Sequence, residues 1–143
     1  MTLIQLNKNI TFAVCVPSHS SSSYLTEIMK YSNVTVLIWE NNTEHLLSMQ
    51  KSAIVLSCAY QENFWFAVHK AIAQGCLPIL PNRAVYPEIF AETYLYNSIE
   101  QANDMIRAFS KNPSLYAQEI KKLQNEYIKQ LTITPLIKNF FEL

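Results

Sequence analysis

Four short apolar runs, with few polar residues inside them, recur along the first half of the chain. They occupy residues 11–16, 34–39, 53–58 and 77–80. A strand with one face in water alternates apolar and polar residues, whereas a strand covered on both faces is apolar throughout. The runs therefore predict strands that are buried on both sides, as in a parallel sheet between layers of helices.

The segments between these runs have the length and spacing of helices. Helices are predicted over residues 24–31, 44–51 and 62–74, and Gly75 follows the third one, where a helix end favours a residue with positive φ. The short connections suit right-handed crossovers between parallel strands. We therefore expect the α/β class, with a Rossmann-like parallel sheet and helices on both faces.

The last third of the sequence is mainly helical. Residues 93–96 predict one more short strand, and Ser98 with Gln101 predicts a capping box that opens a helix. Asn112 and Pro113 then supply the N-cap and first position of a long final helix. The first of these helices should turn Ile99, Ala102, Ile106 and Phe109 inward, and the second should do the same with Tyr116, Ile120, Leu123, Tyr127 and Leu131.

Length and composition restrict the class of protein further. The 143 residues, half of them apolar, are enough for one core, and no linker or repeat interrupts them, so a single domain over 1–143 is expected. Eleven basic residues balance eleven acidic ones, so no net charge draws the chain to nucleic acid or anionic lipid. We find no signal peptide and no apolar run of about 20 residues that could span a membrane, and expect a cytoplasmic location.

The cysteines and the glycine exclude several kinds of site. Cys15, Cys58 and Cys76 lie in or beside apolar runs without metal-site spacing, so they are expected to be buried reduced thiols, and no metal site is expected. Gly75 is the only glycine, which excludes a glycine-rich phosphate loop. A ligand would instead bind beyond the carboxyl ends of the strands, at the loops 17–23, 59–64 and 81–88.

Three sub-motifs follow one another at fixed spacing over residues 60–90. They are Gln61-Glu62-Asn63-Phe64, then Ala71-Ile72 with Gly75-Cys76 and Pro78, then Pro81-Asn82-Arg83 with Tyr86-Pro87-Glu88. This stretch resembles the C-terminal, donor-binding domain of retaining GT-B glycosyltransferases of the sucrose-synthase-like family. It is most similar to the branch that contains the tRNA-queuosine mannosyltransferases, and the resemblance extends from Thr11 to about Gln130.

The resemblance implies a nucleotide-sugar as donor substrate, with no other cofactor and no metal. It assigns Glu62 to the donor sugar, the backbone around Asn63 and Phe64 to the sugar and diphosphate, and Tyr86, Pro87 and Glu88 to the loop that closes on the donor. Glu62 equally suits a first helical turn, where the helix dipole favours a negative charge.

Two positions depart from the family pattern. Trp65 stands where the family has a glycine, and Lys70 stands where it has a glutamate that accepts hydrogen bonds from the ribose; a lysine has no acceptor. The resemblance does not extend to the basic residues that clamp the donor phosphates upstream in the family, or to the acceptor-binding half. We therefore expect a donor-binding half that is partly degenerate and not competent by itself, with a separate N-terminal half as a possible partner. The alternative is a non-catalytic interaction or vestigial domain of the same fold.

Overall fold

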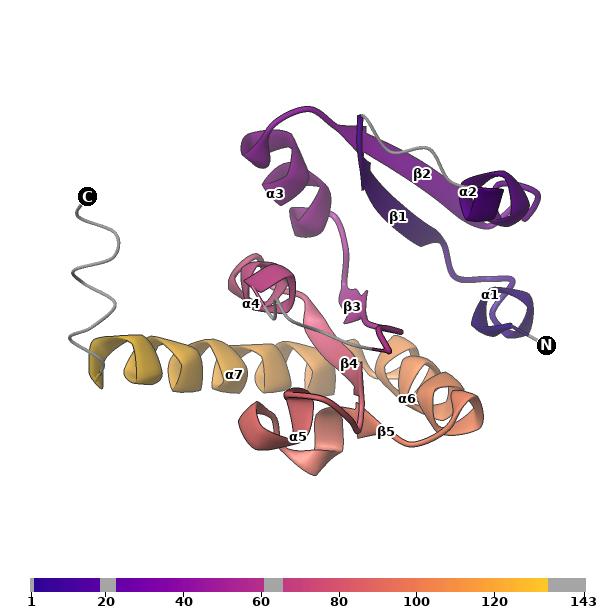
Figure 1. The fold of residues 1–143 in the computed structure, drawn as a ribbon. Helices are drawn as coiled ribbons and strands as arrows, with labels where there is room; N and C mark the ends of the chain where they lie inside the picture. The colour runs from indigo at the N-terminus through magenta and orange to yellow at the C-terminus, as the bar shows by residue number, and fades with distance from the viewer. Residues whose placement is uncertain (1, 19–22, 61–65, 134–143) are drawn as a thin grey trace.

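The computed structural model describes residues 2–18, 23–60 and 66–133 (Figure 1). Strands and helices alternate from β1 to β4, and helices dominate the part that follows. The elements are α1 (Leu3–Leu6), β1 (Phe12–Pro17), α2 (Ser23–Ile28), β2 (Val34–Trp39), α3 (Asn42–Gln50), β3 (Ile54–Leu56), α4 (Phe66–Ala73), β4 (Leu77–Pro81), α5 (Tyr86–Ile89), the 3-10 helix η1 (Glu92–Tyr94), β5 (Leu95–Tyr96), α6 (Ile99–Lys111) and α7 (Pro113–Ile133).

Every strand pair in the described part of the chain is parallel. β1 runs beside β2 along its whole length, β3 pairs with β4, and β4 pairs with β5. Helices flank these strands, and α4, α6 and α7 all contact β4. The α/β class with parallel strands and helical cover, as in a Rossmann-like fold, is therefore confirmed.

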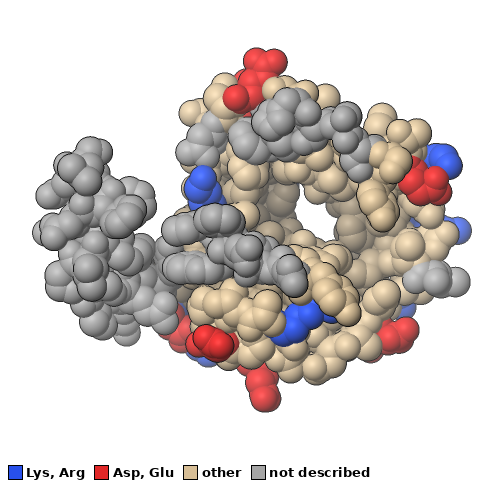
Figure 2. All heavy atoms as spheres, in the orientation of Figure 1, with Lys and Arg blue, Asp and Glu red and all other residues tan. Residues whose placement is uncertain are grey.

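The strands form two sheets, whereas the sequence pattern predicts one. The first contains β1 and β2, and the second has the order β3-β4-β5. Figure 2 shows an opening through the molecule, and comparison with Figure 1 places it between β1 and β3. Within the described residues, β1 and β3 each have a strand partner on one edge only.

Helices contact one another on both sides of this opening. On one side α1 packs against α6, where the Asn7 side-chain amide donates to Asn103 Oδ1 over 2.8 Å. On the other side α3 packs against α4, and the Cys76 thiol lies 3.3 Å from the Met49 carbonyl and 3.2 Å from the Ser52 carbonyl. The helices, rather than a shared ladder of backbone hydrogen bonds, connect the two sheets.

The hydrophobic core belongs to the second sheet. Every residue of β4 and β5 is buried, and α6 and α7 pack on them with Ala102, Ile106, Ile120 and Leu123. In the described side chains of β1, α2, β2 and α3, by contrast, every residue is half-buried or exposed. The packed part of the molecule is therefore the part that carries the motif region.

Strand β3 is shorter than predicted because side chains donate hydrogen bonds to the backbone carbonyl groups of the residues that follow it. The Ser57 carbonyl accepts from the Tyr96 hydroxyl, and the Cys58 and Ala59 carbonyls accept from Arg83. A backbone carbonyl that is satisfied by a side chain needs no partner in a ladder. The strand therefore ends at Leu56, and not at Cys58 as predicted.

The predicted helix ends agree with the structure in most details. Gly75 has φ +98°, Asn112 Oδ1 accepts from the Leu115 N–H, and Ser98 Oγ accepts from the Gln101 N–H. The capping box is only half formed, since the Gln101 side chain accepts from Asn97 instead of Ser98. Ile99 was expected inside but is exposed, because it occupies the first position of α6.

Other predictions need correction. The 3-10 helix η1 replaces the first half of the strand predicted at 93–96, and the sequence pattern did not predict α1 or α5. All three cysteines are free thiols, but Cys58 is exposed because β3 has already ended there; Cys15 is half-buried and only Cys76 is buried. No helix in the described part of the chain has both the length and the apolar character to cross a membrane.

Candidate functional site

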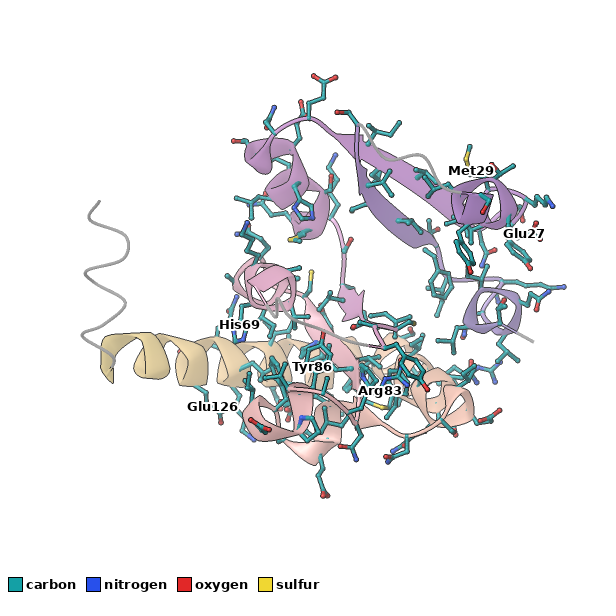
Figure 3. All side chains as sticks on the ribbon, in the orientation of Figure 1. Glu27, Met29, His69, Arg83, Tyr86 and Glu126 are labelled. Atoms are coloured by element: carbon teal, nitrogen blue, oxygen red, sulfur yellow. The ribbon has the colours of Figure 1, made fainter. Side chains whose placement is uncertain are left out.

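The candidate site lies where β3, β4 and β5 end. In parallel strands the carboxyl ends meet at one edge of the sheet, and open α/β sheets bind ligands beyond that edge. The residues that follow these strands are 57–60, 82–85 and 97. In Figure 3, Arg83 and Tyr86 lie near each other at this edge.

Two tyrosine hydroxyls hold Ser57 at the end of β3. The buried Tyr86 donates from its hydroxyl to Ser57 Oγ over 3.1 Å, and Tyr96 donates to the Ser57 carbonyl over 2.8 Å. Burial raises the pKa of Tyr96 far above its ordinary value, so its hydroxyl keeps its proton. Side chains from α5 and β5 therefore fix the position at which the chain leaves β3.

Arg83 connects the loop after β4 to the loop after β3. Its Nε donates to the Ala59 carbonyl over 3.0 Å, and Nη2 lies 3.4 Å from the Cys58 carbonyl. The guanidinium carbon lies 4.8 Å from the centre of the Tyr60 ring, within cation–π range. A planar guanidinium that bonds two successive carbonyls fixes the direction in which that loop runs.

The loop after β4 is held on its other side by amides. The Asn82 N–H donates to the Tyr96 carbonyl over 2.8 Å, and its side chain donates to Asn97 Oδ1 over 3.0 Å. Ala84 has φ +56°, a left-handed conformation that costs a residue with a Cβ about 1 kcal/mol or more. Such strained positions persist where surrounding contacts fix the loop, as Asn82 and Arg83 do here.

The Tyr86-Pro87-Glu88 segment forms α5, one helical turn. Tyr86 is directed inward and packs in the core against Phe90, whereas Pro87 and Glu88 are exposed. The segment thus has an inner residue that supports the sheet edge and two outer residues that are accessible to a ligand. Its assignment to a donor site remains a prediction.

Of the remaining predicted positions, only Lys70 lies within the described residues. Glu62, Asn63, Phe64 and Trp65 fall in 61–65, outside them. Lys70 is exposed in the last turn of α4, where a positive charge suits the helix dipole. Partial burial lowers the pKa of His45 on α3, and the charge of Lys70 lowers it further. The structure thus brings Tyr86, Pro87 and Glu88 together in one turn and places Lys70 on a separate helix.

His69, next to Lys70 on α4, belongs to the core. It is 4% exposed, its ring centre lies 5.6 Å from that of Phe90, and burial lowers its pKa to about 4. An imidazole with that pKa is neutral at pH 7. His69 therefore fills an apolar position.

Candidate metal ligands do not gather in the described residues. Across 2–18, 23–60 and 66–133, no three His, Cys, Asp or Glu side chains are grouped as a metal ion would require. The polar groups at the sheet edge are a guanidinium, amides and hydroxyls, which suit hydrogen bonding to phosphate or sugar oxygens.

Sequence reasoning did not select Ser57, Tyr60, Arg83 or Tyr96 as site residues. Arg83 was within the quoted motif, and its place directly after a buried strand was an available signal. Tyr60 lay in the loop 59–64, which the sequence places at the carboxyl end of a strand, but its contact with Arg83, 23 positions away, carried no local signal. Ser57 had none either, because its contacts are with residues 29 and 39 positions away.

Comparison with known proteins finds a relative that matches part of the chain. The chain is 34% identical over 76 residues to a tRNA-queuosine alpha-mannosyltransferase of Drosophila melanogaster. The match covers 53% of this chain and 20% of the relative, so the chain spans about a fifth of that protein's length. No family model and no solved structure matches the chain. The matched stretch indicates a glycosyltransferase-like relationship.

Proposed function

We propose that this chain is the nucleotide-sugar donor-binding half of a glycosyltransferase and that it does not transfer sugar by itself. The 34% identity to a mannosyltransferase over 76 residues carries the proposal. The polar edge formed by Ser57, Asn82 and Arg83 supports it, since it lies where open α/β sheets bind ligands.

In this proposal Glu62, with the backbone at Asn63 and Phe64, binds the sugar and diphosphate, and Pro87 and Glu88 close on the donor from α5. Backbone N–H groups at a helix start favour the negative charge that develops on a leaving diphosphate. The acceptor would be bound by a separate N-terminal half.

The proposed donor site is weak because of two substitutions. Lys70 cannot accept the ribose hydrogen bonds that the family glutamate accepts, a loss on the order of 2–4 kcal/mol. That free energy corresponds to roughly one and a half to three decades in affinity. Trp65 places an indole where the family has no side chain. We expect a Kd in the millimolar range or weaker for nucleotide-sugars.

A ligand-binding comparison tests the proposal. UDP-, GDP- and ADP-sugars at millimolar concentration should raise the unfolding free energy of the chain by less than about 1 kcal/mol. The double variant Trp65→Gly, Lys70→Glu should bind one of them at least about tenfold more tightly, and adding Glu62→Ala should remove most of that gain. A cooperative melt must first show that each variant folds.

The result that contradicts the proposal is a folded double variant that binds none of these nucleotide-sugars. The exposed position of Lys70 on α4 also suits a second function, a non-catalytic interaction domain that has lost its donor. That reading predicts no binding by either the chain or the double variant, so the same titration separates the two.

A further inference from the structure

Tyr60 combines high exposure with a fixed position. It is 84% exposed, more than any other large apolar side chain in the described part of the molecule. A single exposed aromatic ring is ordinary on a protein surface. The Tyr60 ring differs because a guanidinium lies 4.8 Å from its centre.

Arg83 holds the ring from one side and is itself held. Its Nε and Nη2 are directed at the carbonyls of Ala59 and Cys58, the residues directly before Tyr60. The guanidinium thus bonds the backbone that carries the ring and stacks on the ring as well. Fixing both side chains loses rotamer entropy, and a group already fixed in this way loses little more when a ligand binds.

The ring stands at the ligand-binding edge of the sheet. Tyr60 follows β3 and Arg83 follows β4. Ser57, directly after β3, accepts from the Tyr86 and Tyr96 hydroxyls, and Arg83 and Tyr86 lie near each other in Figure 3. A ligand at this edge meets an exposed aromatic ring beside a positive charge. An aromatic ring stacks on planar bases of any sequence, and a guanidinium attracts phosphate.

We propose that Tyr60 stacks on the base of a nucleoside diphosphate and that Arg83 is the positioning residue that fixes the ring for this contact. A nucleoside diphosphate carries both chemical features that the pair favours, a flat base and negatively charged phosphates. The inference rests on the proposed function, since it names the group that receives the base of the donor nucleotide.

Proton NMR of the 143-residue chain with UDP, GDP and ADP tests the contact. A base stacked on Tyr60 shows upfield ring-current shifts of its own protons, a signature that a structural role for Tyr60 would not produce. Tyr60→Ala should remove these shifts and raise Kd at least about fivefold, the lower limit for base–aromatic stacking. Tyr60→Phe should keep both the shifts and the affinity.

Three further measurements separate stacking from other effects. Inorganic pyrophosphate, which has no base, should bind the chain and Tyr60→Ala equally. Arg83→Lys keeps the charge but loses the planar fork, so it should reduce the ring-current shifts. Tyr24→Ala, which removes another highly exposed tyrosine, should leave nucleotide binding unchanged.

The outcomes distinguish this inference from the proposed function. If the chain binds a nucleoside diphosphate and folded Tyr60→Ala binds it equally well, stacking is wrong and the donor-binding half stands. Stacking is also wrong if Tyr60→Ala weakens the binding of pyrophosphate as much as it weakens the binding of the nucleotides. If neither the chain nor Trp65→Gly, Lys70→Glu binds any of them, both proposals fail.

Discussion

The β1–β2 sheet and the β3-β4-β5 sheet are built from equally apolar strands, yet their surroundings differ. β4 is buried along its entire length, while Ile38 in β2 is 67% exposed. The difference lies in the covering helices, because α6 and α7 are 13 and 21 residues long while α2 and α3 have six and nine. Apolar sequence thus determines which segments become strands, and the reach of the neighbouring helices determines how deeply they are buried.

The largest expected difference between the two sheets is the loss in the free energy of unfolding when a buried or an exposed isoleucine is shortened to alanine. Ile79→Ala, in β4, should lower the free energy of unfolding by about 2–5 kcal/mol, because it leaves a cavity in a packed core. Ile38→Ala, in β2, removes the same atoms from a mostly exposed position and should cost less than about 1 kcal/mol. Urea unfolding of both variants measures the difference. Equal losses would show that the first sheet is packed as firmly as the second.

The next largest loss in the free energy of unfolding should come from disrupting the contact between α1 and α6. The buried Asn7 side-chain amide donates to Asn103 Oδ1 and to the Leu3 carbonyl, so Asn103→Ala leaves one of its two N–H groups without an acceptor and should cost about 1–3 kcal/mol. Asn97→Ala is the matched control, because it removes the acceptor of a similar amide pair, with Asn82, that is exposed to water. Its cost should be below about 1 kcal/mol. If both variants lose the same stability, the α1–α6 contact does not hold the sheets together.

Stability should depend on pH through His69 in the buried region. Burial lowers its folded pKa to about 4 from an ordinary 6.5, so the unfolded chain binds more protons between these values. The His69 contribution is therefore complete above pH 6.5 and is lost as the pH falls toward 4. In denaturant titrations, the free energy of unfolding of His69→Gln should fall less between pH 7 and pH 5 than that of the parent chain.

His45 is the control for that experiment. Partial burial and the nearby Lys70 also lower its pKa, so it acts in the same direction. Because His45 is only half-buried, His45→Gln should change the pH dependence less than His69→Gln does. The reverse order would contradict the placement of His69 in the core.

The smallest effect is chemical, and it concerns the thiols. N-ethylmaleimide at neutral pH should modify the exposed Cys58 first, then the half-buried Cys15, and Cys76 last. Burial raises the pKa of Cys76 to about 11, so very little of it is thiolate. Mass spectrometry over a time course measures the order. Rapid labelling of Cys76 would show that α3 and α4 separate readily.

Local features of the fold could be predicted from the sequence. Val34–Trp39 was predicted with the bounds that the structure has, and Gly75, Ser98 and Asn112 have the predicted positions at helix ends. These features depend on a few neighbouring residues. The division into two sheets depends instead on contacts between distant segments, such as Asn7 with Asn103, which no local pattern contains.

The candidate site could likewise be predicted only in part. The motif around Arg83 and Tyr86 pointed to the carboxyl edge of the sheet, because a buried strand directly precedes it. The motif did not reveal that Tyr86 is directed into the core or that Arg83 reaches back 24 positions to Ala59. The direction of a side chain is set by the tertiary packing of α5 and of the loops.

The position of the core late in the sequence has a consequence for synthesis in the cell. The strands β1 and β2 are synthesised before the core residues between Val68 and Leu123, and they leave the ribosome first. At about 5–20 residues per second, translation from Gln50 to Leu123 takes roughly 4–15 s. During that interval two apolar strands are available to pair with other nascent chains, an association to which exposed strand edges are prone. The order in which this protein is made therefore gives chaperones a period in which to act, and the segment that they would have to shield is the parallel pair β1 and β2, residues 12–39.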